Sequence, residues 1–411
     1  MINGFKKTEI GYIPKDWKII KLKDISMEFI GGGTPSTSNP EYWDGNIPWM
    51  TSTILTKMII NEGMRNITEY GLKNSSTNIV PKGSILIATR VGIGKVGIAG
   101  IDIAINQDLT GIVLNSKQVT TEYLYWFLLN HSMRFKALSQ GTTIKGLTRS
   151  FLKNIKIILP PIFEQQKIAE ILSTVDEAIQ KVEMAIYKTE KLKRGLMQEL
   201  LTKGIGHSQF KKTKIGQIPV EWTIVKLGDE KLIKLIMGQS PSSSTYNKNK
   251  VGLPFFQGKN EFGYIYPTPS IYCAKPIKIA EEKDILLSVR APVGDVNIAL
   301  FKCCIGRGLS AIRVINSELN YLFLFYYLQY FKWRFESISM GSTFKAIRKT
   351  EIENFKFPLP TLPEQQKIAE ILTSIDRRLE LEKERKKRFI KIKIGLMNDL
   401  LTGKKRVNIG G

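Results

Sequence analysis

The sequence predicts an α+β protein in which two globular mixed α/β domains are separated by two long antiparallel coiled-coil helices, with an internal pseudo-two-fold repeat. Three observations lead to this prediction. Blocks of sequence recur about 200 residues apart, heptad patterns of apolar residues follow each diverged region, and those regions contain short apolar runs bounded by turn residues.

The repeat covers most of the chain. The block LPPIFEQQKIAEILSTVD, which starts at Leu159, returns as LPTLPEQQKIAEILTSID from Leu359. A second block, FKKTEIGYIPKDW from Phe5, returns as FKKTKIGQIPVEW from Phe210. Because 411 residues exceed one small domain, we interpret the chain as two copies of one unit of about 200 residues.

The segments that begin at residues 159 and 359 are predicted to be long helices. In the first, residues of the seam recur every seven positions, at Ile168, Val175, Val182, Thr189 and Leu196. This spacing is typical of a coiled coil. The second helix keeps apolar residues toward both ends, but its middle, EKERKKR from Glu382, is polar on every face. Since the chain returns through a second similar unit, an antiparallel pair is expected.

Strands are predicted in the diverged regions between the repeated blocks. The runs GSILIATRVGIGKVGIAGIDIAI from Gly83 and KDILLSVRAPVGDVNIALFKCCI from Lys283 each contain an apolar strand, a turn and a second strand. The turn begins at an arginine in both copies, Arg90 and Arg290. These regions are interpreted as one domain type that carries different surface residues in its two copies.

The charge of the chain indicates a polyanionic partner. There are 61 basic and 37 acidic side chains, a formal charge of +24. Up to Ile205 the chain carries 26 basic and 18 acidic residues, and the remainder carries 35 and 19, so the halves have charges of +8 and +16. Because both halves are basic, nucleic acid is the favoured partner. An ordinary basic protein is the alternative reading.

Other sequence features exclude several classes of protein. Cys273, Cys303 and Cys304 have neither disulfide-framework nor zinc-site spacing, so they are expected to be buried reduced thiols in strands. No run approaches about 20 apolar residues, and the N-terminus has no apolar signal region. A cytoplasmic protein without a membrane span is therefore expected.

Two motifs resemble catalytic sites. Asn39-Pro40-Glu41-Tyr42 is close to the loop with which amino-methyltransferases hold adenine, but Glu41 replaces a proline, and the context indicates a turn. The run from Gly92 to Gly97 fits GxGxxG, but β-branched residues follow it where a phosphate-binding loop needs a helix. Neither copy assembles an acid–base or nucleophilic constellation. A methyltransferase and a structural coiled-coil protein remain as alternatives.

The motifs EQQKIAEIL, at Glu164 and Glu364, and GLM, at Gly195 and Gly395, open and close the two predicted helices. With a diverged region before each helix, the whole chain resembles the specificity subunit of type I restriction–modification systems. The resemblance implies target-recognition domains at residues 1–158 and 204–358, a first spacer helix at 159–203, and a second spacer helix with a C-terminal tail at 359–411.

The same resemblance implies a DNA-reading subunit that is not itself an enzyme. Each recognition domain would read one half of a bipartite, asymmetric site in double-stranded DNA, and the helices would dock two methyltransferase subunits. Restriction–translocase subunits would join the complex. No cofactor is expected on this chain, since S-adenosylmethionine, ATP and Mg²⁺ would be held by the partner subunits.

Candidate contact residues follow from the chemistry of DNA recognition, in which forked donors read base edges while basic and hydroxyl side chains hold phosphates. The DNA-binding candidates are Thr34, Ser36, Arg90, Lys95, Gln107, Thr143, Lys145, Arg149, Gln239, Ser240, Arg290, Arg307, Thr343, Lys345 and Arg348. Residues that differ between the copies are the better candidates for specificity. The partner-docking candidates on the helices are Gln165, Gln166, Lys167, Glu170, Gln365, Gln366, Lys367 and Glu370.

Overall fold

The computed structural model describes residues 4–115, 117–140, 146–340 and 346–407. The chain forms two compact units, residues 1–183 with 385–411 and residues 184–384, called here the first unit and the second unit. The boundary falls in the middle of both long helices, so each unit contains one half of each helix. The recognition domains at 1–158 and 204–358 and the spacer helices at 159–203 and 359–411 stay a prediction from the sequence.

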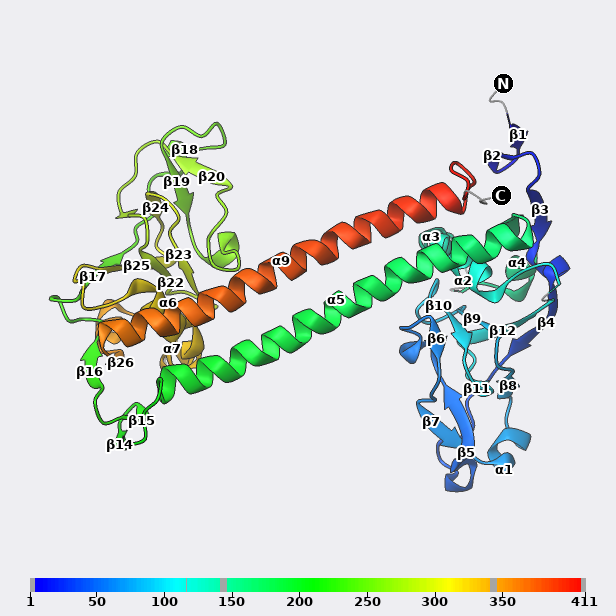
Figure 1. Ribbon diagram of the computed structural model, residues 1–411, viewed down its shortest axis with the longest axis horizontal. Helices are drawn as coiled ribbons and strands as arrows, with labels where there is room; N and C mark the ends of the chain where they lie inside the picture. The colour runs from blue at the N-terminus through cyan, green and yellow to red at the C-terminus, as the bar shows by residue number, and fades with distance from the viewer. Residues whose placement is uncertain (1–3, 116, 141–145, 341–345, 408–411) are drawn as a thin grey trace. The chain divides into compact units, whose positions relative to one another are not determined.

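The first unit is built on two sheets (Figure 1). The five-stranded sheet has the order β4 (Ser26–Gly31), β12 (Leu109–Leu114), β9 (Ile85–Ala88), β10 (Val96–Ala99) and β6 (Ile59–Ile60). The four-stranded sheet has the order β7 (Arg65–Ile67), β5 (Trp43–Met50), β11 (Ile103–Ile105) and β8 (Asn78–Val80). Two strand pairs complete the unit, β1 (Phe5–Thr8) with β2 (Gly11–Pro14) and β3 (Lys18–Lys21) with β13 (Lys156–Leu159).

The second unit repeats this arrangement. Its four-stranded sheet has the order β17 (Ile233–Met237), β25 (Leu309–Val314), β22 (Ile285–Ser288) and β23 (Val296–Ile298). Its five-stranded sheet has the order β18 (Tyr246–Asn247), β20 (Ile271–Cys273), β19 (Leu253–Phe256), β24 (Cys303–Ile305) and β21 (Ile279–Ala280). The strand pairs are β14 (Phe210–Thr213) with β15 (Gly216–Pro219) and β16 (Thr223–Lys226) with β26 (Lys356–Leu359).

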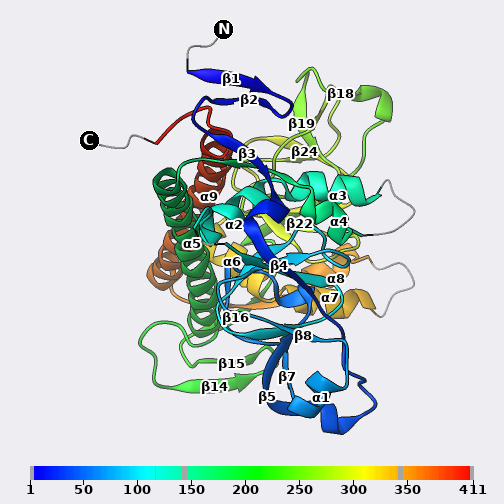
Figure 2. The same cartoon turned by 90° about the vertical axis from the view of Figure 1, so that its right-hand side faces the viewer.

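Short helices connect these sheets to the long ones. They are α1 (Glu69–Lys73), α2 (Thr121–Asn130), α3 (Ser132–Gln140) and α4 (Arg149–Lys153) in the first unit, and α6 (Tyr321–Tyr330), α7 (Lys332–Met340) and α8 (Lys349–Glu353) in the second. Helix α2 buries residues 123–128 because it packs between the sheet and the first long helix (Figure 2). Its Trp126 ring nitrogen donates to the Ser173 hydroxyl at 3.3 Å.

The long helices are α5 (Ile162–Thr202) and α9 (Leu362–Leu400), as the heptad pattern predicts. Ion pairs give their relative direction within each unit. Asp176 and Glu183 of α5 pair with Lys393 and Lys386 of α9 in the first unit, and Glu190 and Lys193 pair with Lys383 and Asp376 in the second. Residue numbers rise along one helix as they fall along the other, so the predicted antiparallel pairing is confirmed.

The polar middle of α9 has a specific counterpart on α5. Lys383 lies 2.9 Å from a Glu190 carboxylate oxygen, and Lys386 lies 2.9 Å from that of Glu183. All four side chains are between one third and one half exposed, so each pair contributes only about 0–1 kcal/mol. The polar stretch therefore selects the partner and the direction of pairing more than it stabilises the pair.

The two motifs that resemble catalytic sites form turns. Asn39 caps the 3-10 turn η2 (Pro40–Tyr42), with its side-chain oxygen accepting from the Glu41 amide at 3.1 Å. Gly92 and Gly94 have φ values of +72° and +87°, and they connect β9 to β10 as a strand–turn–strand unit. The interpretation of both motifs as turns is confirmed.

The three cysteines are buried and unpaired in strands β20 and β24 of the second unit, as expected. Burial raises the pKa of the Cys303 thiol to about 12 and that of Cys304 to about 11. Within the part of the chain that the structure describes, no cluster of His, Cys, Asp or Glu has the arrangement to hold a metal ion. The described helices include none that is long and apolar enough to cross a membrane.

Candidate nucleic-acid interface

Four segments of the first unit meet beside the ends of β4, β9 and β11. The Gly33 amide donates to Ile105 at 3.0 Å, and the amides of Thr89 and Leu147 donate to Asp108 and Thr89 at 2.8 and 2.7 Å. These bonds join residues that are 72, 19 and 58 positions apart in the chain. They line an open cleft of about 230 Å³, which includes the predicted residues Arg90, Gln107 and Arg149.

The side chains of this cleft are suited to a polyanion that also presents hydrogen-bonding groups, as the base edges of a nucleic acid do. Arg90, Gln107 and Arg149 are exposed, and the Thr34 hydroxyl donates to the Gln107 side-chain oxygen at 2.7 Å. The Arg149 guanidinium lies over Gly31, where a Cβ atom would come within 1.7 Å of its Nη2 nitrogen. A side chain at position 31 would therefore displace the end of this arginine from its place in the cleft. The two arginines can contact phosphates, and the Gln107 carboxamide can contact a base edge.

The second unit builds the same frame 200 residues further on. The Gln239 amide donates to Ile305 at 3.1 Å, and the Val289 and Ile347 amides donate to Gly308 and Val289, both at 2.9 Å. Exposed Arg290 and Arg307 occupy the places of Arg90 and Gln107. The backbone of Arg290 forms a bridge with Ala346. The internal repeat therefore extends from the sequence to the geometry of the site.

A hydrogen-bonded group at Ser240 replaces the Thr34–Gln107 pair. The Gln257 side-chain nitrogen donates to the Ser240 hydroxyl oxygen at 2.9 Å, and the Arg307 amide donates to the same oxygen at 3.2 Å. Gln257 was not among the sequence candidates, because its segment has no recognisable counterpart in the other copy. Only the pairing of β19 with β24, in which Phe256 lies opposite Ile305, places Gln257 at the site.

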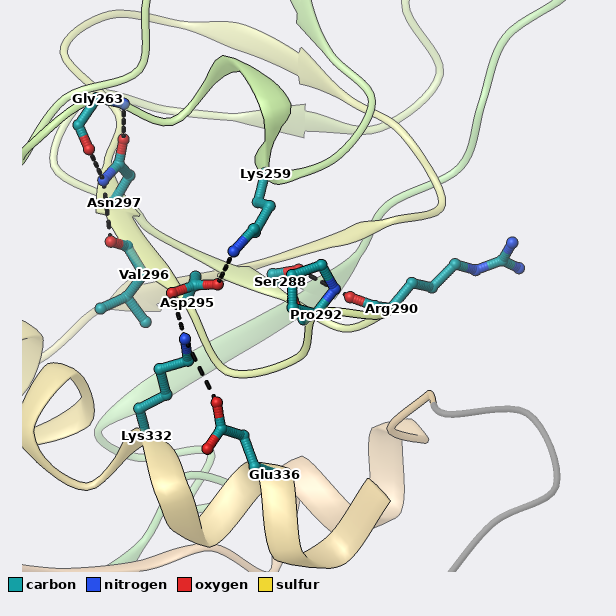
Figure 3. Close-up of polar contacts among 10 residues, drawn as sticks. All are labelled: Lys259, Gly263, Ser288, Arg290, Pro292, Asp295, Val296, Asn297, Lys332 and Glu336. Atoms are coloured by element: carbon teal, nitrogen blue, oxygen red, sulfur yellow. Dashed lines mark hydrogen bonds and ion pairs between the residues drawn. The ribbon is translucent and has the colours of Figure 1, made fainter. Parts of the chain in front are cut away.

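An ionic network supports the turn that carries Arg290 (Figure 3). Asp295 accepts from Lys259 at 2.6 Å and from Lys332 at 2.7 Å. Burial raises the pKa of the Asp295 carboxyl, but the two lysines outweigh burial and lower the pKa below its ordinary value. The Arg290 guanidinium extends away from this network, so the turn is anchored while its arginine stays accessible.

Lys95 stands where the second unit has Asp295, and it has a different environment from the other candidates. Its ammonium group donates to the Ser52 carbonyl at 3.1 Å, and the residue is half-buried. Lys95 therefore stabilises the turn of the first unit through Ser52, and its ammonium group is not part of the proposed DNA-contacting surface.

The remaining DNA-binding candidates lie at the edges of the two sites. Ser36 is exposed and shares a hydrogen bond of 2.8 Å with Ser38. Gln239 is exposed beside Ser240, and exposed Arg348 precedes α8, its backbone amide donating to Glu351 at 2.7 Å. The candidates Thr143, Lys145, Thr343 and Lys345 lie outside the described residues.

The docking candidates on the helices divide into buried and exposed residues. Gln165 is fully buried, and its carboxamide bonds the Thr120 amide at 2.9 Å and the carbonyls of Gln118 and Pro160. Gln365 forms the matching bonds in the second unit. These two glutamines fasten the helix starts to their own units, and we leave them out of the docking surface. Of the others, Lys167 is half-buried, whereas Gln166, Glu170, Gln366, Lys367 and Glu370 are exposed.

The glutamate near the start of each long helix, buried at Glu164 and partly buried at Glu364, was not among the sequence candidates. Glu164 accepts from the Trp17 ring nitrogen at 3.0 Å and from Arg406 at 2.7 Å, so the C-terminal segment is tied into the first unit. Glu364 accepts from Trp222 at 3.0 Å and pairs with His207 at 2.9 Å. The repeated Trp and Glu were visible signals in the sequence, although their contact was not.

Comparison with known proteins defines the class of the repeated unit. The family described as the type I restriction modification DNA specificity domain matches residues 14–188 and again residues 219–390. Both copies of the repeat are thus DNA specificity domains.

Relatives and solved structures extend this likeness over the whole chain. The chain is 42% identical to the putative type I restriction enzyme MjaX specificity subunit of Methanocaldococcus jannaschii, over 98% of this chain and 97% of that one. The MjaVIII specificity subunit of the same organism is 30% identical over 98% and 96% of the two chains. A type I specificity subunit from M. genitalium, at 16% identity, shares the fold, with a TM-score of 0.64 over 93% and 96% of the chains.

A second solved structure adds a complex to the comparison. It is described as the structural basis underlying complex assembly and conformational transition of the type I R-M system, and its matching chain has a TM-score of 0.60 and 27% identity over 96% of this chain and 99% of that one. The chain belongs to the specificity subunits of type I restriction–modification systems, a non-catalytic part of the restriction enzyme complex. The resemblance recognised in the sequence is confirmed.

Proposed function

We propose that each unit reads one half of a bipartite, asymmetric site in double-stranded DNA, in the cytoplasm, and that the cleft residues make the contacts. The observation that carries this proposal is that the two units repeat the same backbone hydrogen bonds around the site but differ in the side chains that these bonds position. The same backbone bonds hold Thr34 and Gln107 in one unit and Ser240 and Arg307 in the other. Two sites of the same geometry with different readable groups are what two different half-sites require.

Phosphate contacts are assigned to the positions that are alike in the two units. Arg90 and Arg290 occupy equivalent turns, so their role is independent of the base sequence. Arg149, Arg348, Ser36 and Gln239 surround the same sites and are proposed to help fix the register on the duplex. Thr143, Lys145, Thr343 and Lys345 remain proposed contacts from the sequence.

We also propose that the long helices dock two methyltransferase subunits, with restriction–translocase subunits joining the complex. S-adenosylmethionine, ATP and Mg²⁺ would then be bound by those partners. Exposed apolar side chains on helices that are otherwise charged support a docking role, since water contact is unfavourable for them. They are Met184, Tyr187 and Leu192 on α5 and Leu381, Ile390 and Ile394 on α9. Gln166, Lys167, Glu170, Gln366, Lys367 and Glu370 are proposed to form its polar part.

The bipartite reading is tested by a domain exchange. Replacing residues 26–155 with the matching region of a relative, in cells that supply the partner subunits, is expected to change one half of the methylated sequence and leave the other unchanged. The first unit's sheets lie within that segment, so its cleft moves as one piece. Sequencing the methylated positions measures the outcome. A change in both halves would contradict independent reading.

The phosphate contacts are tested by the salt dependence of binding. The variants Arg90→Ala and Arg290→Ala are each expected to weaken binding to all duplexes and to reduce the slope of log K against log salt by up to about one. Fluorescence anisotropy with the full chain, over a series of salt concentrations, measures this slope. Lys231→Ala, at an exposed position before β17, serves as the control that loses the same charge. A slope equal to that of the control would remove these arginines from the interface.

A further inference from the structure

Residues 107 and 307 occupy one structurally equivalent position in the two units. Each follows the inner strand of a sheet, β11 or β24, by two residues. The amide just before it donates across to the neighbouring strand, from Asn106 to Met50 at 3.0 Å and from Gly306 to Phe256 at 2.8 Å. The backbone around the two side chains is thus held by the same bonds.

The side chains at this position have different chemistry. Gln107 presents a carboxamide whose oxygen accepts from the Thr34 hydroxyl at 2.7 Å, which orients the group. Among the residues that the structure describes, both amide hydrogens and one oxygen lone pair of Gln107 have no other partner. Arg307 presents an exposed guanidinium. Its backbone amide is held by Ser240, while its side chain forms no hydrogen bond or ion pair with the residues that the structure describes.

These two groups match different base edges. In the major groove, a carboxamide forms paired hydrogen bonds with N6 and N7 of adenine, whereas a guanidinium forms them with O6 and N7 of guanine. The alternative for Arg307 is a phosphate contact, which would carry no sequence information. Arg307 stands where the first unit has Gln107, whose neutral carboxamide cannot neutralise a phosphate charge as an arginine does, and paired bonds to a base edge are a role that suits both groups.

We propose that positions 107 and 307 are equivalent base-reading positions, at which Gln107 contacts an adenine in one half-site and Arg307 contacts a guanine in the other. This inference rests on the proposed reading of DNA by both units. It goes further by assigning one base to one residue in each half.

The test exchanges the two side chains in cells that supply the partner subunits. In Arg307→Gln, one guanine of the second half-site is expected to be replaced by adenine or to lose its preference on the order of tenfold to a hundredfold. In Gln107→Arg, one adenine of the first half-site is expected to change toward guanine. Sequencing of methylated genomic DNA shows which base of which half has changed.

The controls make the same substitutions away from the clefts. Lys231→Gln removes a charge before β17, at the opposite end of that strand from Ser240, and Gln118→Arg adds one beyond the far end of β12. Both are expected to leave the methylated sequence unchanged. Arg307→Lys keeps the charge without the planar fork, so it is expected to weaken the guanine preference while retaining the salt slope.

Three results would overturn the inference. They are a wild-type second half-site without guanine, variants that methylate the wild-type sequence, and an Arg307→Gln variant that loses affinity equally for all duplexes. If Arg307→Gln yields no methylation in cells, binding of the variant is measured in competition with duplexes altered at each guanine of the site. Equal loss of affinity for all duplexes would contradict the proposal, whereas loss of discrimination at one guanine would support it. Failure of the proposed function is distinguishable, because the wild-type complex would then produce no bipartite methylated sequence at all.

Discussion

Inserting four residues into each long helix, between Glu183 and Met184 and between Glu384 and Arg385, is expected to lengthen the gap in the methylated DNA site by one or two base pairs. Four helical residues add about 6 Å at 1.5 Å each. One base pair occupies about 3.4 Å along the duplex, so the added length corresponds to nearly two pairs. The two half-site sequences are expected to stay the same.

The insertion points follow from the division into units. Both lie at the boundary, so the α5–α9 contacts within each unit are preserved, including Asp176 with Lys393 and Lys193 with Asp376. Four residues rotate a helix by only about 40° more than one full turn, so the apolar faces with which α5 and α9 contact each other change direction little. The same insertion into α5 alone shifts it against α9 and is expected to reduce methylation.

The measurement is the methylated sequence in cells carrying the paired insertion. Its control is an unaltered chain expressed with the same partner subunits. If the paired insertion retained methylation with an unchanged gap, the helices would be a docking surface only, and the spacing of the half-sites would have another origin.

Replacing Asp376 by Ala is expected to destabilise the second unit by about 3–5 kcal/mol, because it leaves a buried lysine without its partner. Asp376 is 1% exposed and Lys193 is 8% exposed, with 2.7 Å between the ammonium nitrogen and a carboxylate oxygen. The carboxylate also accepts from Tyr264 at 2.7 Å and from Tyr326 at 2.9 Å. Burial, with the nearby Asp376 charge, raises the pKa of both phenols well above the usual range, so they remain donors.

The repeat supplies a matched control for this variant. Asp176 stands at the equivalent position of α5 and pairs with Lys393, but these side chains are 19% and 20% exposed. Trp126 replaces Tyr326 there and donates to Ser173 instead. Asp176→Ala is therefore expected to cost less stability than Asp376→Ala. The double variant Lys193→Met with Asp376→Leu is expected to recover much of the loss, since it leaves no unpaired charge.

Thiol labelling during urea denaturation measures the second unit specifically. All three cysteines belong to that unit and are buried, and the raised pKa values of Cys303 and Cys304 disfavour the reactive thiolate at neutral pH. Labelling of the native protein is expected to be slow, and its onset should move to lower urea in Asp376→Ala. Asp176 lies in the first unit, so Asp176→Ala is expected to leave this onset near that of the unaltered chain. An onset for Asp376→Ala equal to that of the unaltered chain would contradict the prediction.

Several features of the site were accessible from the sequence. The repeated turn arginines and the differing residues at positions 107 and 307 were identified as candidates because both copies could be aligned. Gln257 was not, because its segment diverges between the copies. Gln165 and Gln365 were interpreted as surface residues because a repeated motif does not distinguish a side chain that contacts a partner from one that bonds inward. Their burial depends on the carbonyls of Gln118 and Glu318, which are 47 residues away.

The sequence by itself determined the duplication, the two long helices and the family, because these depend on periodicity and on blocks of matching residues along the chain. Only the tertiary structure decided that each unit contains one half of α5 and one half of α9. It also decided that the Asp376–Lys193 pair is buried in the second unit, whereas the equivalent Asp176–Lys393 pair in the first unit is partly exposed to solvent. It also placed Thr34 against Gln107, 73 residues away. The physical reason is that burial and hydrogen bonding depend on which surfaces meet in space, and local sequence patterns do not record that.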